Sequence, residues 1–511
     1  MAENKRKTKR VRAALAVILC AAMIAGMGVT AFAADTDTVR LIRGEDVYSY
    51  ALSLDSAAVL EESGFTEGEK ALTLAIKTAI WNGEPRITFS GADYGVTFDS
   101  LSRIVLGLFM EPETFAMSDA YYGTNGDQLY IVPVYNAEMI SDYDAAKAFY
   151  LKNIDEIVSL VDEDWSDVEK ILFVNEYFAL NYEYDLTYKN KDAYTFFRDK
   201  KGVCQAYMRA FEGVMQKLGI EASYVESKSM EHSWNIVKAD GNWYHIDLTW
   251  NDPVTGIKAA VDHDYFLLST DKMVAIGHFE ENDWGYGENV ECSDTTYDNY
   301  FWRSGTDSGA VSAFKNIDGR WYFISREGVC SWDGVSSAPT AEASFASIYA
   351  KIHPEYSFTK YVHNSGLEVI GGRLYLNSAF DVIEYDMSSK QVRSAADVIG
   401  TGVNICSCFI EDGSLYYQTT DNSFYRLDIS VYTEVPGGGY GYYVNDGRLT
   451  LRLDPGACVI AAWYGGDGAM KGCRIIETPG QTSVDMPEGA ALLISLDSAG
   501  APRCEAVQTG G

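Results

Sequence analysis

Three short segments decide the fold prediction for this chain: Gly202-Val-Cys204-Gln-Ala-Tyr207, His232-Ser-Trp-Asn235 and Tyr244-His-Ile-Asp247. Together they supply a thiol, an imidazole and a carboxylate, in that order along the chain. This is the set of groups that acyl transfer through a cysteine thioester requires. A single cysteine, histidine or aspartate does not indicate a catalytic site by itself. The local structure that the sequence predicts around each residue therefore decides its interpretation.

The thiol lies at the start of a predicted helix. Gly219 follows the last apolar position of this segment and predicts the end of the helix. Cys204 would then face the free N–H groups and the positive dipole end of the first turn, which favours the nucleophilic thiolate. The alternative for a cysteine considered by itself is a small buried hydrophobic residue. The apolar positions that define the helical stripe are Tyr207, Ala210, Phe211, Val214, Met215 and Leu218.

The segment from 232 to 250 has the pattern of a β-hairpin. Its two halves are rich in β-forming residues, and the Asp-Gly pair at 240–241 predicts the turn between them. This turn places Ala239 opposite Asn242. The register of all the other pairs in the hairpin follows from that one.

The predicted register brings the imidazole and the carboxylate together. Trp234 faces Asp247, and His232 lies two residues from Trp234 on the same face of the sheet. His232 and Asp247 are therefore diagonal neighbours about 7–8 Å apart at the backbone, and a slip of one residue would separate them. His245 shares the face of Asp247 and is a competing imidazole. The other histidines lack a comparable partner pattern and are predicted to be structural: His263, His278, His353 and His363.

The stretch 204–253 resembles the transglutaminase-like superfamily, and a weaker resemblance extends from about residue 143 to about residue 273. The similarity is to the secreted bacterial branch rather than to animal protein-crosslinking enzymes. It implies an α+β, papain-like core in which a nucleophile helix packs on an antiparallel sheet. It also implies that Cys204 is the nucleophile, His232 the general base and acid, and Asp247 the orienting carboxylate. The backbone N–H of Cys204 would be one oxyanion-hole donor.

Two functions of different classes are compatible with these features. The first is a secreted cysteine acyl-transfer enzyme with a catalytic triad, acting on protein or peptide amides. Water as acceptor would make it a cysteine protease or amidase, a hydrolase; lysine as acceptor would make it a crosslinking acyltransferase. The alternative is a catalytically silent cell-surface adhesion protein on a transglutaminase-like scaffold. No cofactor is implied, and no metal site is predicted.

The first 33 residues have the pattern of a secretory signal peptide. Six basic residues precede an apolar run from Ala13 to Val29, and Ala31-Phe-Ala33 fits a cleavage site. The expected location is secreted, either extracellular or at the cell surface. The apolar run is short for a permanent anchor, and no second run of membrane length follows it, so we expect no membrane span after cleavage.

The chain is strongly acidic, with a net charge of −32 over 511 residues. Such a surface repels nucleic acid, so a nucleic-acid partner is not expected. Eight cysteines follow residue 33. If Cys204 is a free thiolate, the other seven cannot all pair, which argues against a disulfide scaffold. Cys458 with Cys473 or Cys504 is a candidate pair.

The chain is too long for one core, and we predict five segments. A hairpin unit recurs after residue 294, which suggests irregular propeller blades, although three clear copies are few for a closed propeller. The β-domains are candidates for binding a cell-wall or glycan ligand. The copies begin at Asn316, Val369 and Ile410. The segments are the signal peptide (1–33), an N-terminal α/β extension (34–140), the transglutaminase-like core (141–293), a propeller-like β-repeat domain (294–435) and a β-sandwich module (440–511).

Overall fold

The computed structural model describes residues 39–43 and most of the chain from 65 to 509. The predicted signal peptide and His363 lie outside the described residues. Within the described part, no helix has the length and apolar character that a membrane crossing requires. Between 65 and 509 the gaps are at 110, 136–141, 228, 279–283, 286–290, 307–308, 318, 356–365, 431, 436, 446–447, 455, 465–469, 478–479, 486–489, 498–499 and 505.

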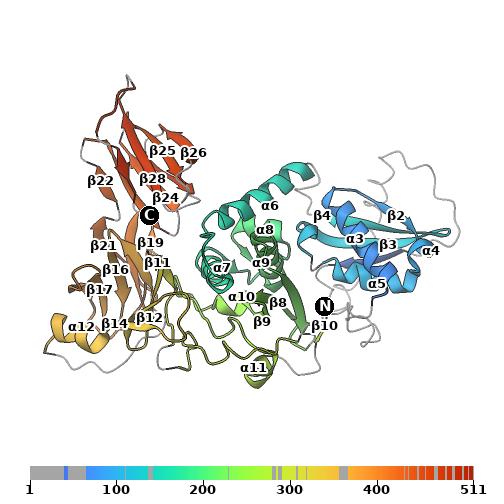
Figure 1. Cartoon of the computed structure of the whole chain (residues 1–511), viewed down its shortest axis with the longest axis horizontal. Helices are drawn as coiled ribbons and strands as arrows, with labels where there is room; N and C mark the ends of the chain where they lie inside the picture. Colours follow the sequence, from blue (N-terminus) through green and yellow to red (C-terminus); the bar gives the residue numbers. More distant parts are fainter. Residues whose placement is uncertain are drawn as a thin grey trace, which may run out of the picture.

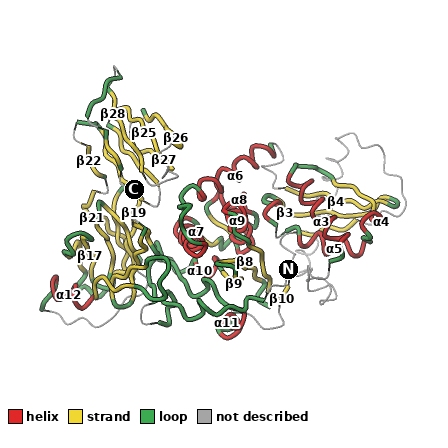
Figure 2. The backbone as a smooth tube through the Cα atoms, in the orientation of Figure 1, coloured by secondary structure: helices red, strands yellow, loops and turns green. Residues whose placement is uncertain are grey.

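The chain runs through four parts in order (Figure 1). An N-terminal α/β unit, drawn in blue, lies beside a helix-rich core, drawn in green. The sheets of the repeat region follow, and the C-terminal sheets, drawn in red, lie beyond them. Most of the helices belong to the first two parts, and the rest is mainly strands and loops (Figure 2).

The N-terminal unit is an antiparallel sheet with strand order β1-β3-β4-β2, accompanied by short helices. Helix α3 buries Leu72, Ile76 and Ile80 on one face, and β4 lies in the interior of the sheet. The buried cluster of this unit also contains Met208 and Tyr224, so the unit packs directly on the core. The elements are β1 (Val39–Arg43), α3 (Glu67–Trp81), β2 (Ile87–Ser90), α4 (Gly91–Tyr94), α5 (Phe98–Gly107), η3 (Pro112–Thr114), β3 (Met117–Asn125) and β4 (Gln128–Tyr135).

The core has the α+β architecture that the sequence predicts. Helix α7 begins with a capping box between Ser166 and Glu169. Helix α9 ends at Gly219, whose φ of 74° is accessible to glycine at little cost. The helical segments are α6 (Tyr143–Val158), α7 (Asp167–Asn181), α8 (Ala193–Asp199), α9 (Cys204–Leu218), α10 (Leu248–Asn251) and α11 (Thr270–Ala275).

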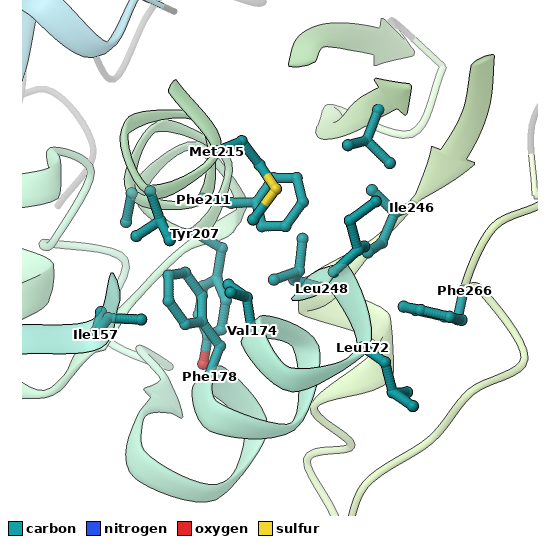
Figure 3. Close-up of a cluster of buried hydrophobic side chains, with 14 of the residues drawn as sticks. Ile157, Leu172, Val174, Phe178, Tyr207, Phe211, Met215, Ile246, Leu248 and Phe266 are labelled. Carbon is teal, nitrogen blue, oxygen red and sulfur yellow. The ribbon is translucent and has the colours of Figure 1, made fainter. Parts of the chain in front are cut away.

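Helix α9 packs against strand β8 of an antiparallel sheet with order β10-β7-β8-β9. Figure 3 shows side chains of α9, including Phe211 and Met215, meeting Ile246 and Leu248 in one apolar cluster. The helix is buried around most of its circumference rather than along one stripe, because the N-terminal unit covers a second face. The strands are β5 (Glu183–Tyr184), β6 (Lys201–Gly202), β7 (Ala222–Ser227), β8 (His232–Ala239), β9 (Asn242–Ile246) and β10 (Trp284–Gly285).

The repeat region contains three consecutive antiparallel sheets, and each predicted hairpin copy opens one of them. Among the described residues no closed propeller is formed, so the propeller-like assignment stays a prediction. The first sheet is β11 (Lys315–Ile317), β12 (Arg320–Ser325), β13 (Gly328–Trp332) and β14 (Thr340–Ser344), followed by α12 (Phe345–Ile352). The second is β15 (Leu367–Ile370), β16 (Arg373–Asn377), β17 (Asp381–Asp386) and β18 (Val392–Asp397). The third is β19 (Ile405–Glu411), β20 (Ser414–Thr419) and β21 (Phe424–Ser430).

The main hydrophobic cluster of the core continues past residue 293. It contains Trp302, Trp321 and Trp332 together with side chains of α7 and α9. The indole Nε1 of Trp321 also donates a 2.8 Å hydrogen bond to Glu169 of α7. The first sheet of the repeat region therefore packs on the core, and the predicted domain boundary at 293 stays a hypothesis.

The C-terminal part consists of two sheets that share one hydrophobic cluster, as in a β-sandwich. None of the eight cysteines among the described residues forms a disulfide, so the candidate disulfide of Cys458 is not present. One sheet contains β22 (Thr433–Val435), β23 (Tyr440–Asn445), β24 (Arg448–Leu453) and β27 (Gly480–Asp485). The other contains β25 (Cys458–Tyr464), β26 (Met470–Ile476), β28 (Ala490–Leu496) and β29 (Val507–Gln508).

Candidate active site

Cys204 is the first residue of helix α9 and is buried. Its N-cap, Val203, has extended backbone and provides no side-chain cap to the first-turn N–H groups. A Cβ at Gly202 would lie 2.6 Å from the Cβ of Ala206 and 2.8 Å from Phe196, so only glycine fits this tight entry. The thiol therefore sits in the first turn of the helix, where the positive end of the helix dipole favours an anion.

The structure brings His232 and Asp247 together. Ala239 pairs with Asn242 and Asn235 with Ile246, which is the register predicted from the Asp-Gly turn. The Nε2 of His232 lies 2.6 Å from Oδ2 of Asp247, and the carboxylate side chain is fully buried. A short, buried hydrogen bond of this kind fixes the orientation of the imidazole ring.

The three predicted residues interact electrostatically. Burial alone would lower the pKa of His232, but Asp247 and then Cys204, by charge and hydrogen bonding, raise that pKa to about 10. Burial would raise the pKa of Asp247, yet His232 and a second histidine, His278, hold it well below its usual range. An ionised Asp247 beside a protonated His232 is thus the favoured state, and the imidazolium faces Cys204.

His278 is the residue of this site that the sequence interpretation missed. Its Nε2 lies 2.9 Å from Oδ2 of Asp247, and both side chains are fully buried. It follows helix α11 and is 31 residues from Asp247 along the chain. Because no hairpin register links the two, only the tertiary fold could have placed it.

His245, the competing imidazole, belongs to a different pair of hydrogen bonds. Its Nδ1 accepts from the indole of Trp234 at 3.0 Å, and its Nε2 lies 3.1 Å from Oγ1 of Thr270. Burial, and secondarily the charge of His278, lower the pKa of His245 to about 3. A neutral ring held at both nitrogens is a structural element of the hairpin.

Aromatic side chains surround the imidazoles. The ring of Trp250 lies 6.2 Å from that of His232 and 4.6 Å from that of His278, and 42% of the Trp250 residue is exposed. Tyr184, in β5, is half-buried beside the start of α9 because β5 pairs with β6. Burial first, and then the charges of Cys204 and Asp247 among others, raise the pKa of Tyr184. The site therefore has an aromatic edge open to solvent.

One group of potential metal ligands occurs in the described part of the chain. Ligand atoms of His232, Asp247 and His278 lie within 4.8 Å of one another. The hydrogen bonds of both imidazoles to Asp247 account for this clustering by themselves. The imidazole nitrogens and the carboxylate oxygen are already joined by hydrogen bonds, so we assign no metal to this group.

A carboxyl next to the nucleophile helix gives a testable pH dependence. Asp252 accepts a hydrogen bond from Tyr207, and burial raises the pKa of this carboxyl to about 7. The folded state therefore binds more protons than the unfolded state between about pH 4 and pH 7, so Asp252 lowers stability as the pH rises through that window. We expect Asp252→Asn to raise the free energy of unfolding at pH 8 by up to about 3 kcal/mol and to change it little at pH 4.

Denaturant unfolding at the two pH values measures this effect. Asp185 is the matched control, because hydrogen bonds led by that of Thr187 outweigh burial and lower its pKa to about 2. Asp185→Asn should therefore destabilise the protein at pH 8. Equal effects of Asp252→Asn at pH 4 and pH 8 would contradict the assignment of a neutral Asp252.

The comparisons with known proteins concern this same region. A family model described as the transglutaminase-like superfamily matches residues 156–248. The kyphoscoliosis peptidases of Homo sapiens and Mus musculus are each 24% identical over 166 residues, covering 28% of this chain and 25% of the relative. The chain thus spans about a quarter of the length of these curated relatives.

Two solved structures are similar to parts of the chain. A TGase is 14% identical, covers 53% of this chain and 94% of its own, and has a TM-score of 0.19. A putative cysteine protease from Cytophaga hutchinsonii is 12% identical, with coverages of 43% and 69% and a TM-score of 0.18. By the match to the family model, residues 156–248 are a transglutaminase-like domain, of a superfamily related to peptidases and transglutaminases.

Proposed function

We propose that this chain is a cysteine acyl-transfer enzyme that acts on protein or peptide amides through Cys204, His232 and Asp247. The observation that carries the proposal is the buried 2.6 Å contact of His232 with Asp247, on the face of the hairpin that meets Cys204. A buried carboxylate–imidazole pair with shifted pKa values, beside a thiol at a helix N-terminus, is the kind of arrangement that clusters at active sites, and this supports an enzyme over a silent scaffold.

The residues support a two-step reaction. The Cys204 thiolate attacks the amide carbonyl, and the backbone N–H of Cys204 donates to the developing oxyanion. The imidazolium of His232 then gives its proton to the leaving amine, and Asp247 keeps the ring oriented. Water or an amine such as lysine attacks the thioester, with His232 now accepting the proton. Hydrolysis results in the first case and crosslinking in the second.

The remaining parts of the proposal concern place and partners. The basic and apolar pattern of residues 1–33 supports export, with action outside the cell or at its surface. The β-repeat sheets, which we propose to be propeller-like, and the C-terminal sandwich would bind or space rather than react. Their proposed ligand is a cell-wall component, a glycan or a peptide.

A labelling and turnover experiment tests the function. Casein, a protein that contains glutamine and lysine, is the test substrate. We expect the full chain either to cleave amide bonds of casein or to attach a fluorescent primary amine to casein. Cys204→Ala should abolish both activities while its unfolding transition stays close to that of the wild type. Amine incorporation identifies a crosslinking enzyme, and new peptide termini identify a peptidase. If the wild type matches Cys204→Ala in all assays and its thiol reacts like an ordinary one, the silent adhesion hypothesis replaces this proposal.

A further inference from the structure

One oxygen of the triad carboxylate serves two imidazoles. Oδ2 of Asp247 lies 2.6 Å from Nε2 of His232 and 2.9 Å from Nε2 of His278. The other oxygen, Oδ1, accepts the backbone N–H of Trp250 at 3.1 Å. Because a carboxylate only accepts, both imidazoles present an N–H to the same oxygen, and its charge is divided between them.

We propose that His278 is a positioning residue that shares Asp247 with His232 and thereby limits how strongly the triad holds its proton. The inference rests on the proposed function of Cys204 and His232. It adds to that function a residue that the Cys-His-Asp set does not include. His278 does not touch the thiol by this assignment; it acts through Asp247.

The surroundings of His278 suit this role. Its ring packs among three aromatic rings, with centroid distances of 5.1 Å to Trp234, 4.6 Å to Trp250 and 4.7 Å to Tyr265. Its backbone N–H donates to Met273 at 3.0 Å, which anchors the residue to the end of α11. Its Nδ1 is buried and has no hydrogen-bond partner among the described residues. Among the described residues, the polar interaction of the buried His278 ring is therefore the contact of its Nε2 with Asp247.

Sharing matters because His232 must both accept and release a proton. A buried carboxylate with one imidazole partner would stabilise the imidazolium more than a carboxylate that already accepts a second N–H. An imidazolium held too tightly is a poor acid for the leaving amine, and it does not become the base that deacylation needs. The titratable groups facing this cluster from the elements around it are Cys204, Tyr184, His245 and Tyr265.

Hydrolysis of p-nitrophenyl acetate isolates deacylation, the step in which His232 must accept a proton. Sγ of Cys204 attacks the ester carbonyl, the bond to the phenolic oxygen breaks, and p-nitrophenolate leaves in a burst. Water then attacks the acetyl thioester, its proton passes to neutral His232, acetate leaves, and the thiol recovers the proton. In the acyl-enzyme the thiolate charge is absent, so the pH dependence of the slow phase reports the proton affinity of His232 beside Asp247.

Two variants separate charge sharing from packing. His278→Phe keeps an aromatic ring among the tryptophans but removes the N–H donor, whereas His278→Gln keeps a donor near the Nε2 position. We expect His278→Phe to move the pH midpoint of deacylation upward by about one unit, which slows the step about tenfold at a pH below the midpoint. His278→Gln should restore most of the wild-type profile.

His263 provides a matched control. It is equally buried, contacts the Glu176 carboxylate at 2.6 Å through Nε2, and also has an Nδ1 without a partner among the described residues. His263→Phe should lower stability without moving the deacylation midpoint. An unchanged or lowered midpoint in His278→Phe, or a change that His278→Gln does not reverse, would overturn the proposal.

The outcome for the wild type keeps the two proposals apart. If the wild type shows no burst beyond that of Cys204→Ala, the proposed enzyme function fails. If the wild type shows a burst and a titrating slow phase while His278→Phe behaves identically, the enzyme function stands and the role of His278 fails.

Discussion

Replacing His232 with alanine is expected to slow alkylation of Cys204 by iodoacetamide at pH 6 by about a hundredfold. An ordinary thiol with a pKa near 8.5 is less than about 1% thiolate at that pH, whereas an imidazolium and a helix N-terminus keep the thiolate populated. The raised pKa of His232, to about 10, keeps the ring charged throughout the neutral range. The measurement is the labelling rate of Cys204, followed by peptide mass spectrometry, from pH 4 to pH 10.

Two variants test the assignment within the same experiment. Asp247→Asn should leave the hairpin folded and reduce labelling at pH 6, because a neutral amide stabilises the imidazolium less than a carboxylate. His245→Ala should leave the labelling profile close to that of the wild type, since its ring bonds to Trp234 and Thr270 instead. If Cys204 of the wild type labels like a free thiol, or if His245→Ala is the damaging change, the proposed mechanism is wrong.

The second large effect concerns stability. Trp302 is fully buried, and its ring lies 5.2 Å from that of Phe266 in the core and 5.8 Å from that of Trp332 in β13. Trp302→Ala should therefore lower the free energy of unfolding of the transglutaminase-like domain by about 3–5 kcal/mol. The measurement is denaturant unfolding, with the reactivity of Cys204 toward a thiol reagent as the probe, because this probe reports on that domain specifically.

Leu449 is the control for this experiment, because it is fully buried in the separate cluster of the C-terminal sandwich. Leu449→Ala should destabilise the sandwich and leave the exposure of Cys204 almost unchanged. If Trp302→Ala also leaves the exposure of Cys204 unchanged, the core folds independently of everything beyond residue 293. Limited proteolysis near residue 293 and near the glycines at 437–439 would then give stable fragments, as the five-segment prediction requires.

Local features of the core could be predicted because each depends on a few neighbouring residues. The helix that starts at Cys204 follows from the 3.6-residue spacing of its apolar positions and from Gly219. The contact of His232 with Asp247 follows from the Asp-Gly turn, because a two-residue turn fixes the register of a whole hairpin. The three hairpins of the repeat region were predictable for the same reason.

Contacts between distant segments depended on the tertiary structure. No periodicity relates His278 to Asp247, and the segment that joins them includes helix α11. Trp302 and Trp321 likewise follow the change to a strand-rich pattern, yet they pack in the same cluster as helices α7 and α9. Sequence spacing predicted that Cys204, His232 and Asp247 form one set of candidate residues. The packing of remote segments decided that the carboxylate has a second imidazole partner and that the main hydrophobic cluster includes side chains beyond residue 293, because both depend on where the chain returns in space.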